Sequence, residues 1–395
     1  MQLSIRLSIW VFALLLVCLG CNKGNADPRD DTSGIILNQA PMSSAYEQMT
    51  NCMSLAPVGR MKKAGVACVQ GGVRAELLTP VAHRILLSMP QLTDVQIPLC
   101  YAIAATPREV GTEFRLLERE GSNTVVTVQL KGAQGQAVEI HWSALVLLTD
   151  RPGADRRGPV EPYLKASACV QSTDQQVRTL AERLWPADGK VEGYAAAIQD
   201  FIRHMKQESQ PRSLDALSIL ESRANWICTA NANLAAALLR AKGIACRSVA
   251  VVPTVGQRLE MHRIIEYFDA GHWGSFDPSS LQPDVPLKSW QNIIMARTTL
   301  ADEELAMKPR MGSSVGCPYG QEFEMLDSGV SLLAENDFFW TQAKPLAEYE
   351  VSDRAIGQAR KEWENFMRSG ELSQGQLKAA GVTNAAGLLE AFETK

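Results

Sequence analysis

The sequence lacks a long run of basic residues, internal repeats and low-complexity tracts. Its 395 residues carry a formal net charge of −4, with Lys and Arg mixed among Asp and Glu. A nucleic-acid-binding surface needs clustered basic residues to neutralise phosphates, so no nucleic-acid partner is expected. The composition, 46% hydrophobic and 21% charged, is that of a globular protein with room for two or three packed domains.

The apolar run near the N-terminus is too short to span a membrane. Ile9–Leu19 is almost wholly apolar and follows a single positive charge, Arg6. A bilayer core needs about 20 apolar residues, whereas this length fits a secretory signal. Gly20-Cys21 resembles a bacterial lipoprotein signal, in which Cys21 becomes the lipidated first residue. Cys18 departs from that pattern, so cleavage without lipid is the alternative. We expect an exported protein on the periplasmic side of the envelope, anchored to the membrane through Cys21.

The cysteine count agrees with export. Nine cysteines are present, and removing Cys18 with the signal and Cys21 as lipid carrier leaves seven. An odd number in an oxidising compartment indicates disulfide pairs plus one free thiol. If Cys228 is that thiol, the other six can form up to three disulfides. The alternative is that all are buried free thiols.

Changes in periodicity divide the chain into segments. Alternating or apolar runs at 95–104, 113–120, 124–131 and 137–149, separated by turn residues, predict a small β-domain, for which a sandwich is one arrangement. The predicted organisation is a lipoprotein-type signal peptide (1–21), a tether (22–40), a β-rich domain (41–160), a catalytic domain (161–297) and a helical C-terminal region (298–395).

Helical spacing dominates the first part of the catalytic segment. One helix is expected after a cap at 172–174, a second over 194–205, and a third from Cys228 to a stop at Gly243. Strands are predicted at 247–253, 260–268 and 272–276. A further helix, 353–368, is predicted in the C-terminal region.

Cys228 is the candidate nucleophile because it falls in the first turn of the third helix. Unpaired N–H groups and the positive end of the helix dipole favour a thiolate there. Such a position lowers a thiol pKa from about 8.5, and a partner imidazole lowers it further. Taken alone, this cysteine is better interpreted as a buried thiol or a half-cystine, with Cys246 as one possible partner.

The hairpin around Asp269-Ala270 changes that interpretation. A strand pair folding back there places His262 opposite Asp277, with Cα atoms about 4.5–5.5 Å apart. The carboxylate can hold one ring nitrogen and leave the other for the thiol. On the same register His272 falls near the turn, which favours a surface position.

Glu266 has two possible roles. It lies four residues after His262 on the same strand face, where it either forms a hydrogen bond near the site or stays a solvated charge. The same register places Trp273 opposite Glu266, at a core edge.

Several short stretches carry a resemblance to one family. Cys228–Ala232, Leu238–Ile244, Arg247, His262–Glu266 and Trp273–Pro278 together resemble the bacterial transglutaminase-like superfamily. The resemblance covers roughly 170–280. It implies an α+β fold with a papain-like core, here between the N-terminal β-rich domain and the C-terminal helical region, and a catalytic triad of Cys228, His262 and Asp277.

The sequence departs from the family at two positions. Trp226 replaces the small residue usual two positions before the nucleophile, where it could wall the substrate cleft. Ala245 replaces a common Pro.

The expected chemistry is acyl transfer on a peptide or protein substrate, more as a peptidase or amidase than as a crosslinking transglutaminase. The Cys228 N–H is the expected oxyanion donor. Asn225 is a candidate second donor, although a structural or capping role for it is favoured. No metal, organic cofactor or identifiable partner protein is implied. The alternatives are an inactive papain-like scaffold that binds or assembles envelope components and a disulfide-stapled structural lipoprotein.

Overall fold

A computed structural model describes separate stretches of the chain. They all lie within one compact unit, Ile35–Lys395. None of their helices has the length and apolar character needed to cross a bilayer. The predicted signal peptide, with Cys21, lies outside them. The described residues are 35–37, 65–119, 123–149, 160–205, 213–225, 227–254, 262–280, 285–300, 303, 323–325, 330–332, 340–348, 356–357, 359–361 and 363–364.

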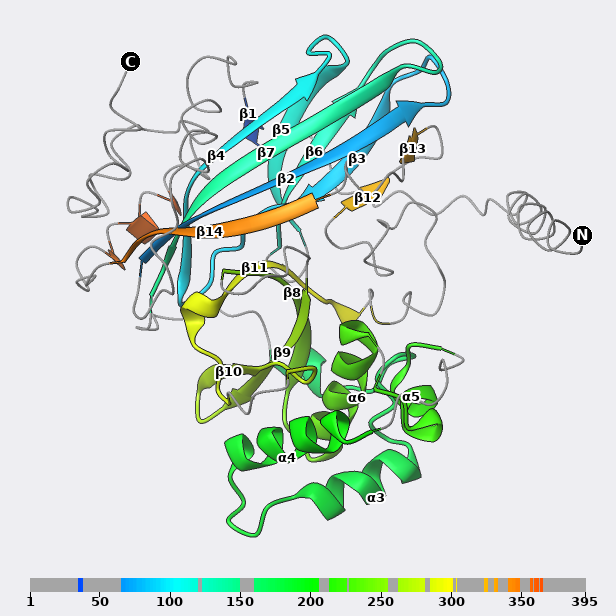
Figure 1. The fold of residues 1–395 in the computed structure, drawn as a ribbon, viewed down its shortest axis with the longest axis vertical. Coiled ribbons are helices and arrows are strands. Elements are labelled where there is room, and N and C mark those ends of the chain that lie inside the picture. Colours follow the sequence, from blue (N-terminus) through cyan, green and yellow to red (C-terminus); the bar gives the residue numbers. More distant parts are fainter. Residues whose placement is uncertain are drawn as a thin grey trace, which may run out of the picture. The chain divides into compact units, whose positions relative to one another are not determined.

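The N-terminal part is built from two antiparallel sheets (Figure 1). Their inward side chains, such as Ile85 and Leu116 from one sheet and Val69 and Leu145 from the other, belong to one buried apolar cluster, as in a sandwich. The four predicted strands are confirmed. The first sheet runs β1 (Ile35–Leu37), β5 (Gly111–Arg119), β6 (Asn123–Leu130), β3 (His83–Ser88) and β12 (Phe323–Met325). The second runs β13 (Val330–Leu332), β2 (Gly65–Leu77), β7 (Ala137–Leu148) and β4 (Gln96–Thr106), and β14 (Trp340–Glu348) also pairs with β2.

Two segment predictions need correction. Residues 35–37, expected within the tether, form β1 and pair with β5. The C-terminal region is not wholly helical, because β12, β13 and β14 pair with β3 and β2 of the sandwich. These strands gain their hydrogen bonds from distant partners, so no local pattern marks the two shortest. The predicted helix at 353–368 is confirmed at its described residues, and its Ile356, Ala359 and Trp363 pack into the sandwich core.

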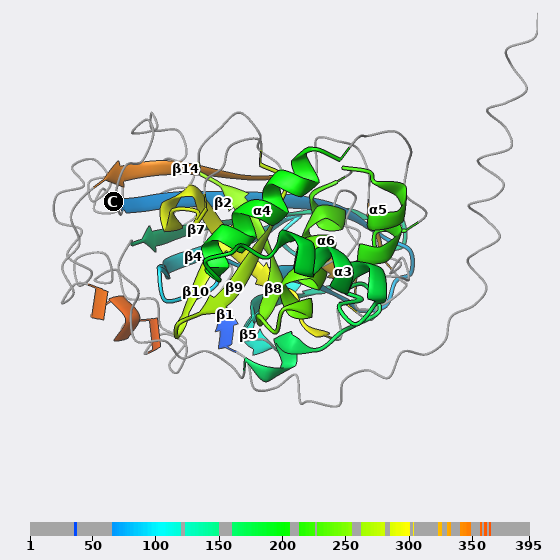
Figure 2. The same ribbon diagram turned by 90° about the horizontal axis from the view of Figure 1, so that it is seen from below.

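The second part places four helices against a four-stranded sheet. Figure 2 shows the helices gathered on one side of the strands. One buried apolar cluster joins them to that face through Cys246, Ile265, Tyr267 and Phe276. The helices are α3 (Gln175–Leu184), α4 (Val191–Arg203), α5 (Ala216–Ser222) and α6 (Cys228–Ala241). The sheet runs β10 (His272–Phe276), β9 (His262–Asp269), β8 (Cys246–Pro253) and β11 (Asn292–Arg297); the short 3-10 helices are η2 (Glu161–Leu164) and η3 (Ser289–Gln291).

Helix α6 is the central helix of this part. Every residue from Thr229 to Arg240 is buried, and its many alanines let neighbouring helices and strands approach closely. The helix ends as predicted at Gly243, which has a φ of +72°. The N–H groups of Gly243 and Ile244 donate to the carbonyls of Arg240 and Leu239 at 2.9 and 3.1 Å, the pattern of a Schellman cap. This firm end and complete burial fix the position of the first turn.

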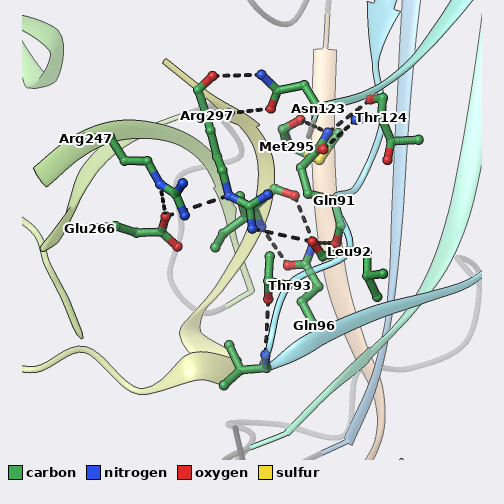
Figure 3. A network of polar contacts seen from close by, with 12 residues as sticks. Gln91, Leu92, Thr93, Gln96, Asn123, Thr124, Arg247, Glu266, Met295 and Arg297 are labelled. Atoms are coloured by element: carbon green, nitrogen blue, oxygen red, sulfur yellow. Dashed lines mark hydrogen bonds and ion pairs between the residues drawn. The ribbon is translucent and has the colours of Figure 1, made fainter. Parts of the chain in front are cut away.

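Strand β11 forms the edge of the four-stranded sheet, and side chains from the sandwich cover that edge (Figure 3). The Gln96 amide donates to the Ile294 carbonyl at 2.9 Å and accepts from the Ile294 N–H at 2.7 Å. Gln91 Nε2 donates to the Met295 carbonyl at 2.6 Å. These amides satisfy backbone groups that an uncovered edge strand would leave unpaired.

Asn123 extends this coverage to the end of β11. Its side-chain amide donates to the Arg297 carbonyl and accepts from the Arg297 N–H, both at 2.8 Å. Val252, Ile293 and Met295 also belong to the sandwich core cluster. The sheet of the second part is therefore bonded to the sandwich by both polar and apolar contacts.

We predict that Gln96→Leu destabilises the whole described unit. Gln96 is 1% exposed, and leucine would leave the Ile294 N–H buried without its acceptor, at a cost of about 1–3 kcal/mol. Urea unfolding of purified protein measures this. Gln176→Leu, at an exposed position on α3, is the control; equal midpoints for the two variants would contradict the prediction.

Candidate active site

Cys228 is the first residue of α6, as predicted. The residue before it, Ile227, has extended backbone angles and makes no side-chain cap to the helix. The backbone N–H groups of the first turn therefore have no hydrogen-bond acceptor in the N-cap side chain. The positive end of the α6 helix dipole lies at the Cys228 thiol. Ile227 is 39% exposed, so solvent reaches this end of the helix.

His262 and Asp277 meet in direct contact. His262 Nε2 lies 2.8 Å from Asp277 Oδ2, with the two side chains 23% and 19% exposed. The other carboxylate oxygen of Asp277 accepts the Ser279 N–H at 2.8 Å. Gln199 Nε2, from α4, donates to the Asp277 carbonyl at 2.8 Å. The carboxylate is thus held on both oxygens, and its backbone is held by a helix.

The Cys228 thiol contacts His262 and the start of β9. Burial opposes ionisation of the thiol, but the hydrogen bond and positive charge of His262, together with the backbone N–H and charge of Arg263, lower the pKa of Cys228 below its ordinary value of 9.0. Because His262 Nε2 faces Asp277, the ring nitrogen left for the thiol is Nδ1. The three side chains are thus linked by contacts in the order Cys228, His262, Asp277.

The same contacts hold a proton on His262. Burial favours the neutral ring, but hydrogen bonds to Asp277 and Cys228 and the negative charges of both groups outweigh it. They raise the pKa of His262 from 6.5 to about 10. The raised histidine pKa and lowered thiol pKa together favour a thiolate–imidazolium pair at neutral pH.

Comparison with known proteins identifies the part of the chain that carries this arrangement. Residues 178–278 match the family model of the Transglutaminase-like superfamily, and they include Cys228, His262 and Asp277. They form a transglutaminase-like domain. The match confirms the resemblance predicted from the motifs. No curated protein matches the sequence.

Solved structures agree at the level of the fold. One described as a "Putative Cysteine Protease from Cytophaga hutchinsonii" matches with a TM-score of 0.53 and 17% sequence identity, over 74% of this chain and 94% of that chain. At this identity the match shows a shared fold. A "putative protease from Parabacteroides distasonis" matches with a TM-score of 0.24 and 14% identity, over 53% of this chain and 43% of that chain, which is too low to support an argument.

The predicted strand register of the transglutaminase-like domain is wrong by two residues. His272 pairs with Asp269 and Phe276 with Ile265, because the chain reverses at Ala270-Gly271, both with positive φ. Positive φ at both central residues is typical of a tight two-residue hairpin turn. His272 is exposed.

Asp277 still reaches His262, for a different reason from the one predicted. It lies directly after the end of β10, where the chain turns: the Ser280 N–H donates to the Asp277 carbonyl at 3.2 Å. The carboxylate therefore comes from a turn that follows the hairpin and does not come from a facing strand position.

Glu266 is not a solvated charge, and it does not face Trp273. It is 6% exposed and pairs with Arg247 at 2.7 Å, with Arg297 3.8 Å away (Figure 3). On β10 its partner is Ser275. The Arg247 guanidinium lies 4.1 Å from the Trp273 ring centroid. Burial and repulsion by Arg247 lower the pKa of Arg297 to about 10. Glu266 thus belongs to a buried ion cluster beside β11.

The remaining predicted site residues have separate outcomes. Asn225 Oδ1 accepts a hydrogen bond from Asn231 Nδ2 at 2.9 Å, a contact within the protein. Trp226 lies outside the described residues. A Cys228–Cys246 disulfide is contradicted, because both are free thiols and Cys246 Sγ donates to the Ala236 carbonyl at 3.4 Å. Burial raises the pKa of Cys246 to about 11.

Sequence reasoning missed the groups that contact the triad residues: the Gln199 amide, the Arg263 backbone N–H and the Ser279 N–H. An Asp side chain often accepts the backbone N–H two residues further on, forming a local turn. That signal could have identified Ser279. Within the described ranges, no group of three or more His, Cys, Asp or Glu is arranged to hold a metal ion.

We predict that iodoacetamide modifies Cys228 selectively at neutral pH. The alkylation rate should rise as pH passes the lowered Cys228 pKa, stay level, and change again near pH 10, where His262 loses its proton. Mass mapping measures the rate at each pH. Cys246 is the internal control, since its thiol is buried and its pKa raised; equal labelling of both cysteines, or a first rise only above pH 9, would contradict the site.

Proposed function

We propose that the transglutaminase-like domain catalyses thiol-dependent acyl transfer on peptide or amide substrates, with water as the usual acceptor. The observation that carries this proposal is the linked arrangement of Cys228 at the start of α6, His262 and Asp277. The shared fold with a structure described as a putative cysteine protease supports the same reaction class.

In the first half-reaction the Cys228 thiolate attacks the carbonyl carbon of the substrate. A carbon–sulfur bond forms, and the carbonyl oxygen becomes an oxyanion that the Cys228 N–H, at the first turn of α6, stabilises. The His262 imidazolium donates its proton to the departing amine as the carbon–nitrogen bond breaks. The product is a thioester on Cys228 and a neutral His262.

In the second half-reaction His262 removes a proton from water, and the resulting hydroxide attacks the thioester. The carbon–sulfur bond breaks, the acid product leaves, and the thiolate–imidazolium pair is restored. Asp277 keeps the ring oriented in both steps through the 2.8 Å contact. An amine in place of water would give an amide, the crosslinking reaction.

Hydrolysis is the favoured outcome for an exported enzyme, because water is present at far higher concentration than amines. Export rests on the apolar segment Ile9–Leu19 and the following Gly20-Cys21. We propose that the mature protein is held at the periplasmic membrane surface by lipid on Cys21. In that position its substrates would be peptides or proteins of the cell envelope.

We predict that Cys228→Ala reduces peptide hydrolysis to background, and that Asp277→Asn reduces kcat by about 100- to 10,000-fold, the range of general acid–base catalysis. A quenched peptide library measures cleavage, and a labelled primary amine measures transfer. Amine incorporation without cleavage would make the protein a transferase.

Two controls complete this experiment. His272→Gln changes an exposed histidine of the same hairpin and should leave activity unchanged, whereas His262→Gln should abolish it. Cys228→Ala should remain folded at the assay temperature, because Cys228 is only partly buried. Equal cleavage by wild type and Cys228→Ala would contradict the proposal and favour a non-catalytic binding scaffold.

A further inference from the structure

Asn231 connects the nucleophile helix to the loop that carries Asp277. It lies three residues after Cys228 in α6, and residues at this spacing share one face of a helix. Its side chain is completely buried. Nδ2 donates two hydrogen bonds, to Asn225 Oδ1 at 2.9 Å and to Ser279 Oγ at 3.0 Å.

These bonds complete a circuit of contacts that runs from Cys228 through His262, Asp277, Ser279 and Asn231 and returns to Cys228 along α6. Ser279 accepts from Asn231 through its hydroxyl and donates its N–H to Asp277 Oδ1 at 2.8 Å. Asp277 Oδ2 contacts His262, and His262 contacts Cys228. The helix backbone then returns from Cys228 to Asn231. The loop carrying the carboxylate and the helix carrying the thiol are therefore joined through Asn231 as well as through His262.

We propose that Asn231 is a positioning residue for this triad, through which α6 sets the place of the Asp277 loop; the proposal rests on the proposed function of the same site. The second donor contact, to Asn225, ties down the segment that enters α6 at the nucleophile. One buried amide group thus holds the chain just before Cys228 and just after Asp277.

The Asn231 amide group can donate both hydrogen bonds, and it contributes little to the free energy of unfolding. Asn231 Oδ1 is buried and accepts no hydrogen bond from the described residues, which offsets part of what the two donated bonds contribute. An aspartate would accept where Asn231 donates, and would place a second buried carboxylate in the circuit with Asp277. An alanine would suit the apolar helix but would release Ser279.

The nearby Asn233 provides a matched control. It is also buried on α6, 6% exposed, and its Nδ2 donates at 2.9 Å to the Leu214 carbonyl, which precedes α5. Replacing either asparagine by alanine removes the same group from the same helix. Only the Asn231 change interrupts the circuit around the triad.

The experiment measures the alkylation rate of Cys228 by iodoacetamide across pH, which needs no substrate. In Asn231→Ala a loosened Asp277 loop holds the His262 proton less firmly, so the Cys228 pKa should rise. We expect the first rise of the rate profile to move to higher pH by about one unit, which lowers the rate about tenfold at pH values below the wild-type midpoint, while Asn233→Ala keeps the wild-type profile. If Asn231→Ala and Asn233→Ala give the same profile, the proposal is overturned.

Ser279→Ala removes the hydrogen bond between Asn231 and Ser279 at its less buried partner. This variant tests the proposal if Asn231→Ala does not fold. It should shift the profile in the same direction, and Ser279→Thr, which keeps a hydroxyl, should restore most of the rate. The double variant Asn231→Ala/Ser279→Ala should be no slower than the slower single variant; additive losses would overturn the shared contact. A wild type that alkylates as expected but cleaves no peptide would instead contradict the proposed function alone.

Discussion

The contact between His262 and Asp277 is the constraint on which the site depends. It raises the affinity of the imidazole for a proton, and that proton in turn stabilises the Cys228 thiolate against the cost of burying it. Neither effect requires a contact between Cys228 and Asp277. That hydrogen bond, acting through His262 and together with the backbone N–H and charge of Arg263, therefore favours a thiolate where burial alone would keep the thiol protonated.

The rest of the fold keeps the elements that carry these groups in place. Helix α6 is buried along almost its whole length, so its first turn cannot shift without disturbing the core. The fully buried pair of Arg240 with Glu303, 2.7 Å apart, ties the far end of α6 to a distant segment of the chain. The sheet that carries His262 has its edge strand covered by glutamine and asparagine side chains of the sandwich. The sandwich thus takes part in holding the site even though it supplies none of the three reacting groups.

Local patterns predicted the elements around the site well. The cap at Asp174 and the stop at Gly243 are each marked by the residue type that the geometry favours, and both are confirmed. The start of α6 at Cys228 is also confirmed, although its N-cap residue, Ile227, makes no side-chain cap. The hairpin register was harder, because Ala270 adopts a positive φ that its side chain disfavours. The contact between His262 and Asp277 was predicted on a wrong register and is nevertheless present, since the carboxylate lies on the turn that follows β10.

Features that depend on distant partners were not predictable in this way. Glu266 is buried beside Arg247 and Arg297, and neither arginine is marked as its partner by spacing along the chain. The three C-terminal strands owe their hydrogen bonds to sheets formed more than 200 residues earlier. In the sequence Asn231 is a polar residue in an alanine-rich helix, with nothing to mark a partner. Its hydrogen bond to Ser279 forms only because the fold brings that distant residue beside it.

His262 keeps its proton because Asp277 and the Cys228 thiolate flank it. An NMR titration of the His262 ring in the intact protein, before and after alkylation of Cys228, tests this directly. The ring should keep its proton to about pH 10 in the unmodified protein and lose it at a clearly lower pH once alkylation removes the thiolate. A ring that titrates near its ordinary pKa of 6.5 in both forms would contradict it.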